Sequence, residues 1–383
     1  MAIDNKDKKI LNVPHLRFPE FSGEWEMVSL QDIATINPKS DPLQNTFIYI
    51  DLEAVEKGEL RKIQEIMREE APSRAQRVID NNDILFQCVR PYQKNNYIHR
   101  ILNTSNQQWV ASTGYAQIRT TELPNYIYHL LNTDEFNRKV MVRCTGSSYP
   151  AINSEDLATI HLYYTPDKKE QLKISRLLDL LDKRIATQNK IIEDLKKLKS
   201  AISLNVLHSD KWEQFKIKDI AQIGRGRVIS SIEIGQQKSP TYPVYSSQTS
   251  NDGIMGYLDD YMFEGEYISW TTDGANAGTV FYRNGKFNCT NVCGLLKLRK
   301  EFDTHFVSLV LAEATKKYVS INLANPKLMN NTMGNIQIRL PKLEEQKRIS
   351  IVFRVLQRLW TVHNSLLTEY TKQEQYLLSQ MFI

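Results

Sequence analysis

The chain has 383 residues, of which 41% are apolar and 24% charged, and its 49 Lys and Arg exceed its 44 Asp and Glu by five. This length is enough for about two or three ordinary domains. No apolar stretch approaches the roughly 18 residues of a membrane-spanning helix, which excludes an integral membrane protein. The polar start, residues 1–13, carries three lysines and no apolar run, so we expect no secretory signal and a cytoplasmic protein.

The four cysteines, Cys88, Cys144, Cys289 and Cys293, are too few and too irregularly spaced for a disulfide framework. We expect free thiols, as in a reducing compartment. Cys289 and Cys293 lack the second ligand pair that a structural zinc site needs, so no metal site is expected.

An internal repeat organises the chain. WEMVSLQDIATI from Trp25 returns as WEQFKIKDIAQI from Trp212, with six identities in twelve positions, and PDKKEQLKIS from Pro166 returns as PKLEEQKRIS from Pro341, with five in ten. Each copy is a globular segment followed by a long helical one. The predicted domains are therefore residues 14–165, 166–208, 209–340 and 341–383, and the duplication implies an approximate two-fold relation.

The first globule, residues 14–165, has strand-like and helix-like runs. FIYIDLEAV from Phe47 and RVIDNNDILFQCVRP from Arg77 are rich in β-branched and aromatic residues and are bounded by turn residues, whereas NYIYHLLNTDEFNRKVMV from Asn125 has helical periodicity. The predicted class is α+β, with mixed α/β globules.

Two polar loops of this globule are candidate DNA contacts. The first, which follows the strand-like DILFQCV and is predicted to be an exposed hairpin tip, contains Arg90, Tyr92, Lys94, Asn95 and Asn96. Arg and Asn are side chains that read guanine and adenine edges, so Asn95 and Asn96 are predicted to help determine the bases read. The second contains Ser147, Ser148 and Tyr149, whose hydroxyls suit phosphate, beside Gly146, which suggests a close backbone approach. A solvated turn is the alternative for the first loop.

The long segments 166–208 and 341–383 are predicted helices. From Ile174 and from Ile349, ten positions spaced alternately by four and three residues are apolar in eight cases in each copy. This spacing is that of a coiled-coil seam, and the simplest partner of each helix is the other one, packed antiparallel. Gln188 and His363 interrupt the two seams at matching positions, and antiparallel packing would bring them within about one helical turn of each other. Two separate helices, each lying on its own globule, are the alternative.

Residues 168–199 of the first long segment hold ten Lys and Arg against five Asp and Glu. This face is either solvated or a surface for phosphates or a protein partner.

The second globule, residues 209–340, is richer in loops, because eleven of the fifteen glycines fall between Gly224 and Gly334. Its strand-like runs are separated by polar loops that are also candidate DNA contacts. They contain Ser246, Ser247, Gln248, Thr271, Thr272, Asp273, Asn276 and Arg283.

The sequence shows no catalytic motif. The Gly285-Lys286 pair has Val280 where a phosphate-binding loop needs its first glycine, and no two prolines are adjacent, as the tetrad of an amino-methyltransferase requires. We therefore expect a recognition protein rather than an enzyme.

These repeated motifs, together with DILFQCVRP and the stretch EYISWTTDGANAGTVFYRNGKFNCTN, resemble the specificity subunit of type I restriction-modification systems from about Pro14 to Phe382. The resemblance implies two target-recognition domains that each read half of a bipartite double-stranded DNA target, held apart by two antiparallel helices. It also implies two modification subunits that methylate adenine with S-adenosylmethionine, and restriction subunits that use ATP and Mg, translocate and cut. No cofactor is expected in this chain.

Two other functions stay open. The chain is alternatively a coiled-coil adaptor that binds proteins and no DNA, which a DNA gel shift with partner subunits would test. It is alternatively an enzyme whose active site the sequence does not reveal, which an assay with S-adenosylmethionine would test.

Overall fold

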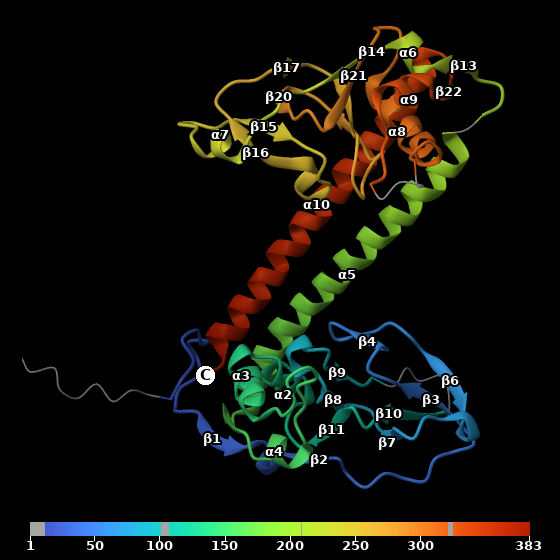
Figure 1. The fold of residues 1–383 in the computed structure, drawn as a ribbon. Coiled ribbons are helices and arrows are strands. Elements are labelled where there is room, and N and C mark those ends of the chain that lie inside the picture. The colour runs from blue at the N-terminus through green and yellow to red at the C-terminus, as the bar shows by residue number, and fades with distance from the viewer. Residues whose placement is uncertain (1–11, 101–106, 208, 321–324) are drawn as a thin grey trace, which may run out of the picture. The chain divides into compact units, whose positions relative to one another are not determined.

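The computed structural model describes residues 12–100, 107–207, 209–320 and 325–383, and the chain divides into two compact units (Figure 1). The first unit contains the chain up to Ile191 together with His363–Ile383, and the second unit is Ile192–Val362. Both long helices therefore contribute residues to both units.

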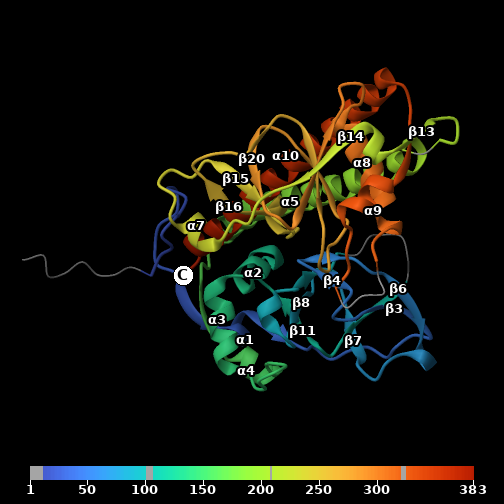
Figure 2. The same cartoon turned by 45° about the horizontal axis from the view of Figure 1, so that its top comes forward.

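The first unit contains two four-stranded sheets (Figure 2). One has the order β6 (Gln64–Met67), β3 (Thr46–Ile50), β10 (Gln108–Ser112) and β7 (Ala75–Ile79), with β3 and β10 parallel. The other has the order β2 (Ala34–Ile36), β11 (Tyr115–Thr120), β8 (Ile84–Gln87) and β9 (Tyr97–Ile98). Two-stranded pairs are formed by β1 (Glu26–Ser29) with β12 (His161–Tyr164), and by β4 (Val55–Glu56) with β5 (Glu59–Leu60).

The second of these sheets is buried on both faces. Because side chains alternate along a strand, Ile84 and Phe86 of β8 pack in the helical core, whereas Leu85 packs with residues of the other sheet such as Ile50 and Ala111. Strand β8 therefore lies between the helical core and the other sheet, which fixes the position where the loop from β8 to β9 begins.

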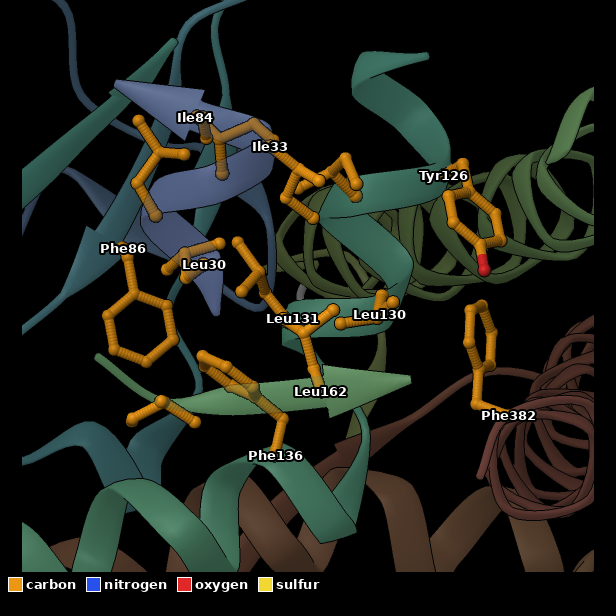
Figure 3. Close-up of a cluster of buried hydrophobic side chains, with 14 of the residues drawn as sticks. Leu30, Ile33, Ile84, Phe86, Tyr126, Leu130, Leu131, Phe136, Leu162 and Phe382 are labelled. Carbon is orange, nitrogen blue, oxygen red and sulfur yellow. The ribbon is translucent and has the colours of Figure 1, made fainter. Parts of the chain in front are cut away.

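The helical core of the first unit joins segments that are far apart in sequence (Figure 3). Its helices are α1 (Leu30–Ile33), α2 (Pro124–Leu131), α3 (Asp134–Arg143), α4 (Ser154–Ala158) and the adjoining parts of α5 (Lys168–Val206) and α10 (Leu343–Met381). Trp25 of the repeated motif packs edge-on against Tyr126 and Phe382, with ring centroids 6.3 and 6.1 Å away. The repeated tryptophan therefore ties the start of the globule to the end of α10.

The second unit repeats this topology. Its sheets have the orders β14 (Ala221–Arg225), β21 (Cys293–Leu298), β18 (Tyr267–Thr271), β19 (Val280–Arg283), and β16 (Ile254–Leu258), β15 (Tyr242–Tyr245), β20 (Lys286–Cys289), β17 (Phe263–Glu264). The remaining elements are β13 (Glu213–Lys216) paired with β22 (Gln337–Leu340), and α6 (Ile217–Ile220), α7 (Ser231–Gly235), α8 (Thr304–Ala314) and α9 (Asn330–Asn335). The pair β15 and β20 is parallel, as β3 and β10 are, so the four-stranded sheets confirm the predicted duplication. The pair of β4 and β5 has no counterpart among the described strands of the second unit.

The predicted antiparallel seam is also confirmed. In the first unit His363 Nδ1 lies 2.7 Å from Gln188 Oε1, and in the second unit Lys199 Nζ donates to Gln357 Oε1 at 3.3 Å. Within the first unit, Arg184 donates to the Tyr370 hydroxyl at 3.4 Å, so the earlier residue of α5 contacts the later residue of α10, as in an antiparallel pair. Within the described residues, no helix has both the length and the apolar composition to cross a lipid bilayer. The four cysteines are unpaired in the structure.

The two units differ at one matched position of the seam. Lys199 and Gln357 of the second unit correspond, by the repeat offset, to Glu374 and Asp182 of the first. Burial and the neighbouring carboxylate of Glu374 raise the pKa of Asp182 above its ordinary value. The first unit therefore places two carboxyl groups where the second has an ammonium and an amide.

We expect the double variant Gln188→Leu/His363→Leu to melt roughly 2–4 °C higher, which corresponds to ~1 kcal/mol, because apolar side chains in a helix seam usually stabilise more than a polar pair. We also expect a looser register or swapped dimers, since a polar seam position specifies alignment. Calorimetry and light scattering measure the two effects. The control is Thr187→Leu/Thr361→Leu, which adds the same groups at exposed positions. A double variant that melts unchanged and stays monomeric contradicts the prediction.

We expect Asp182→Asn to stabilise the protein more at about pH 8 than at about pH 5. A carboxyl with a raised pKa keeps its proton in the folded state after the unfolded chain has released it, so stability falls as pH rises above about 4. Asparagine cannot ionise and removes this loss. Melting curves at both pH values measure it, with the exposed Asp194→Asn as control. An equal change at both pH values would count against this assignment.

Candidate DNA-recognition loops

The first candidate loop, residues 88–96, connects the antiparallel strands β8 and β9, as predicted for a hairpin. It contains a single 3-10 turn, η2 (Pro91–Gln93), between two left-handed residues, Arg90 with φ 55° and Lys94 with φ 51°. Left-handed backbone is costly for residues with a Cβ, and it persists where the surroundings impose it. The loop therefore has one defined shape.

Asn96 is part of what imposes this shape. It is only 2% exposed, its Oδ1 accepts a hydrogen bond from the Gln87 N–H at 2.8 Å, and its Nδ2 donates to Asn132 Oδ1 at 2.9 Å. The expectation that Asn96 lies exposed on the tip is wrong, because both amide atoms are used inside the unit. In the sequence, an asparagine that bonds the buried end of a strand looks the same as an asparagine that reads a base.

Lys94 and Asn95 are also engaged with the scaffold, although both are half-buried rather than buried. Lys94 Nζ lies 2.6 Å from Asp134 Oδ1, and Asn95 Oδ1 accepts from the Lys57 N–H at 3.0 Å. Tyr92 is exposed.

The loop at residues 145–151 packs directly on this first loop. The Arg90 N–H donates to the Pro150 carbonyl at 2.7 Å, and the Arg90 guanidinium lies 4.3 Å from the centre of the Tyr149 ring. Gly146 has φ 90°, and a Cβ there would lie 2.9 Å from the Tyr149 carbonyl, so the predicted close approach is present. The structure thus brings the two predicted loops into one surface, which we call the first reading surface. It consists of Arg90, Tyr92, Ser147, Ser148 and Tyr149.

The second unit has an equivalent surface. In the loop between β18 and β19, residues 272–279, Asp273 forms an isolated β-bridge with Lys327. Lys327 forms a second β-bridge with Ser320. The same pattern links Val89 and Thr145 to Ala151 in the first unit. We call Asp273, Asn276 and Lys327 the second reading surface. Asn276 and Lys327 are exposed, and Asp273 is half-buried. The sequence alone did not indicate Lys327, which is identified only by the repeated topology.

Thr271 and Thr272 do not belong to this surface, because they are 1% and 2% exposed. The Thr271 hydroxyl donates to the Asn276 carbonyl, and the Thr272 hydroxyl donates to the Val292 carbonyl at 2.9 Å. Both hydroxyls close the loop from inside, so the two threonines lie beneath its surface, and their contact with DNA stays a prediction.

Arg283 lies at the other end of β19, opposite Tyr267, and only 2% of it is exposed. Its guanidinium is 3.6 Å from the centre of the Tyr245 ring, Nε donates to Ser269 Oγ at 3.0 Å, and Nη1 pairs with Asp252 Oδ2 at 2.9 Å. These partners enclose the guanidinium, so the structure does not place Arg283 at the surface of the unit. Its contact with DNA stays a prediction.

Ser246, Ser247 and Gln248 follow β15 close to Arg283 and are half-buried. The Gln248 side-chain amide donates to the Ile254 carbonyl. These residues therefore lie apart from the second reading surface, and the predicted contacts of this globule fall into two groups.

One set of described side chains has the composition of a metal site. His129, Asp179 and Asp182 place a ring nitrogen and two carboxylate oxygens within 4.8 Å of one another. His129 Nε2 lies 2.8 Å from Asp179 Oδ1, and Asn125 Nδ2 donates to Asp179 Oδ2 at 2.5 Å. Through these two hydrogen bonds, Asp179 of α5 holds α2 in place.

Comparisons with known proteins agree with the fold and the repeat. The family model of the type I restriction modification DNA specificity domain matches twice, at residues 22–197 and 209–370. A putative type I specificity subunit of Mycoplasma pneumoniae is 37% identical over 201 residues, which cover 51% of this chain and 82% of that protein. The specificity subunit of the type I restriction enzyme MpnII, from the same organism, is 42% identical over 149 residues, 39% of this chain and 44% of that protein.

Among solved structures, the S subunit of a type I restriction-modification system from M. genitalium superimposes with a TM-score of 0.70 at 15% identity, covering 97% of this chain and 99% of that one. A chain from a type I restriction-modification system, solved in work on its assembly and conformational transition, gives a TM-score of 0.54 at 20% identity, covering 93% and 97%. These likenesses concern the fold. Because the family model matches both units, the chain belongs to the type I restriction-modification DNA specificity subunit family.

Proposed function

We propose that each unit reads one half of a bipartite double-stranded DNA target, and that the chain presents this target to partner subunits without catalysing a reaction itself. The observation that supports this most directly is the pair of reading surfaces. Each is built from the same hairpin loop and the same following loop of a duplicated fold. Partner subunits would supply adenine methylation with S-adenosylmethionine, and ATP- and Mg-dependent restriction, in the cytoplasm.

The two surfaces offer different chemistry, which suits two different half-sites. The first combines a cation stacked on an exposed aromatic ring with two serine hydroxyls, groups that contact guanine edges and phosphates. The second offers Asn276 and Lys327, which suit adenine and phosphate. Asn95 stays a predicted contact, through the amide nitrogen of its side chain.

The long helices carry a second apolar stripe that the seam does not use. Leu180 is 60% exposed and its repeat counterpart Val355 is 52% exposed, and each has an exposed apolar neighbour one turn earlier, Leu177 or Val352. Exposed apolar groups at matched positions of both copies point to protein contacts. We call the two pairs the helix patches.

The charge beside the helix patches indicates what covers them. Lys183 and Arg358 occupy matched positions next to the patches, and between Gln346 and Thr368 α10 has four Lys and Arg and no acidic residue. A partner helix with apolar residues flanked by Asp or Glu would fit. We propose that each patch binds one modification subunit. The same patches favour the alternative of an adaptor that binds proteins and no DNA.

We expect the chain, assembled with its modification subunits and S-adenosylmethionine, to direct methylation of adenines in a sequence of two specified parts separated by unspecified bases. Sequencing the methylated DNA measures this. Tyr149→Ala should relax preference in one part only, by about 1–3 kcal/mol for each base that the variant no longer reads. Val142→Ala, at another exposed position, is the control. A continuous methylated sequence would sink the proposal, and complexes that form but bind no DNA would favour the adaptor.

We expect Leu180→Glu and Val355→Glu each to lower the number of bound modification subunits from two to one, because each places a charge in an apolar interface. Native mass spectrometry counts the subunits. Thr361→Glu adds the same charge at an exposed position of α10 outside the patch and should leave two bound. Retention of both subunits by the two patch variants would show that the partners bind elsewhere.

A further inference from the structure

The turn after Gln248 in the second unit has an unusual backbone. Asn251, Asp252 and Gly253 are all left-handed, with φ values of 49°, 53° and 82°. Three consecutive residues in this region are uncommon, and the two with a Cβ pay a free-energy cost. Such strain persists only where neighbouring groups impose it, and it is concentrated at functional sites.

Arg283 is the group that imposes it. Its guanidinium is enclosed between the rings of Tyr245 and Phe281, at 3.6 and 4.4 Å from their centres, and is anchored to Ser269 Oγ. Its Nη1 donates to Asp252 Oδ2 at 2.9 Å. A buried, oriented cation therefore holds the turn at its second left-handed residue.

The rest of the turn is closed around the same guanidinium. The Ser246 N–H donates to the Gly253 carbonyl at 2.9 Å, and Gln248 donates to the Ile254 carbonyl. Gly253 has φ 82°, which favours glycine, and a Cβ there would also be crowded, at 3.0 Å from Arg283 Nη2 and 3.2 Å from the Gln248 carbonyl. The half-buried residues 246–248 are thus the base of a rigid turn.

The turn projects polar side chains outward. Asn251 is exposed, although its Nδ2 also donates to the Ile254 carbonyl at 3.5 Å. The Asp252 side chain is 70% exposed, and one of its oxygens is held by Arg283. A carboxylate facing DNA is normally repelled by phosphates, but the paired cation offsets this charge. The outer oxygen of Asp252 can then accept from a cytosine amino group. The second N–H and the oxygen of the Asn251 amide are the donor and acceptor that adenine requires.

We propose that the turn at residues 249–253 is a base-reading element of the second unit, with Asn251 and Asp252 as its contacts and Arg283 as the positioning residue that preforms it. This inference rests on the proposed function and adds to it a reading element outside the second reading surface. The side chains of Asn251 and Asp252 face the DNA, whereas Arg283 acts only through Asp252 and the turn.

The test uses the assembled complex and measures methylation rates on a panel of DNA targets in which each base of both half-sites is varied. Asn251→Ala should flatten the preference at one or two adjacent positions of a single half-site, by about 5- to 150-fold, and leave the other half-site unchanged. Asn335→Ala, at an exposed asparagine at the end of α9, should leave both half-sites unchanged.

Arg283→Lys keeps the charge but loses the planar stacking and the fixed donors. It should flatten the same positions as Asn251→Ala while the unchanged half-site keeps its preference, which a general loss of folding would not produce. A uniform loss of methylation without altered preference, or full preference in Asn251→Ala, would overturn the proposal. The exposed Asn251 variant decides the matter even where Arg283→Lys fails to fold. A wild-type complex without a bipartite preference would instead overturn the proposed function.

Discussion

The apolar seam shared by α5 and α10 is the constraint on which the rest of the structure depends. A 39-residue helix with an apolar seam is not stable alone in water, and each of these two helices covers the seam of the other. The seam continues into the cores of both units, where Leu181 and Leu377 belong to the first and Ile349 and Phe353 to the second. The pairing of the helices and the packing of each core therefore depend on the same side chains.

Within each unit, buried polar groups shape the loops that carry the proposed function. Asn96 closes the loop after β8, the Thr271 and Thr272 hydroxyls close the loop after β18, and Arg283 fixes the turn after β15. Each of these side chains satisfies backbone or side-chain partners that would be costly to bury unpaired. The exposed residues that they position are then free to differ between the units.

The duplication lets each unit act as a control for the other. The β-bridges at Lys327 and at Ala151 show that both units keep one pair of loops. The seam differs in detail, because the second unit has Lys199 and Gln357 at the positions where the first has Glu374 and Asp182. What both copies retain despite such divergence is the strongest guide to function. By this criterion the reading surfaces and the helix patches are the strongest candidates for functional sites.

The sequence by itself determined the repeat, the two long helices, their antiparallel pairing and the proximity of Gln188 to His363. These follow from periodicity and chain connectivity, which are local or near-local properties. It also located loops 88–96 and 145–151, but it did not distinguish Asn96, Thr271, Thr272 and Arg283 from surface residues. Burial depends on which distant segments pack around a side chain, so only the tertiary structure decided that these four lie inside and that Asn251 and Asp252 face outward.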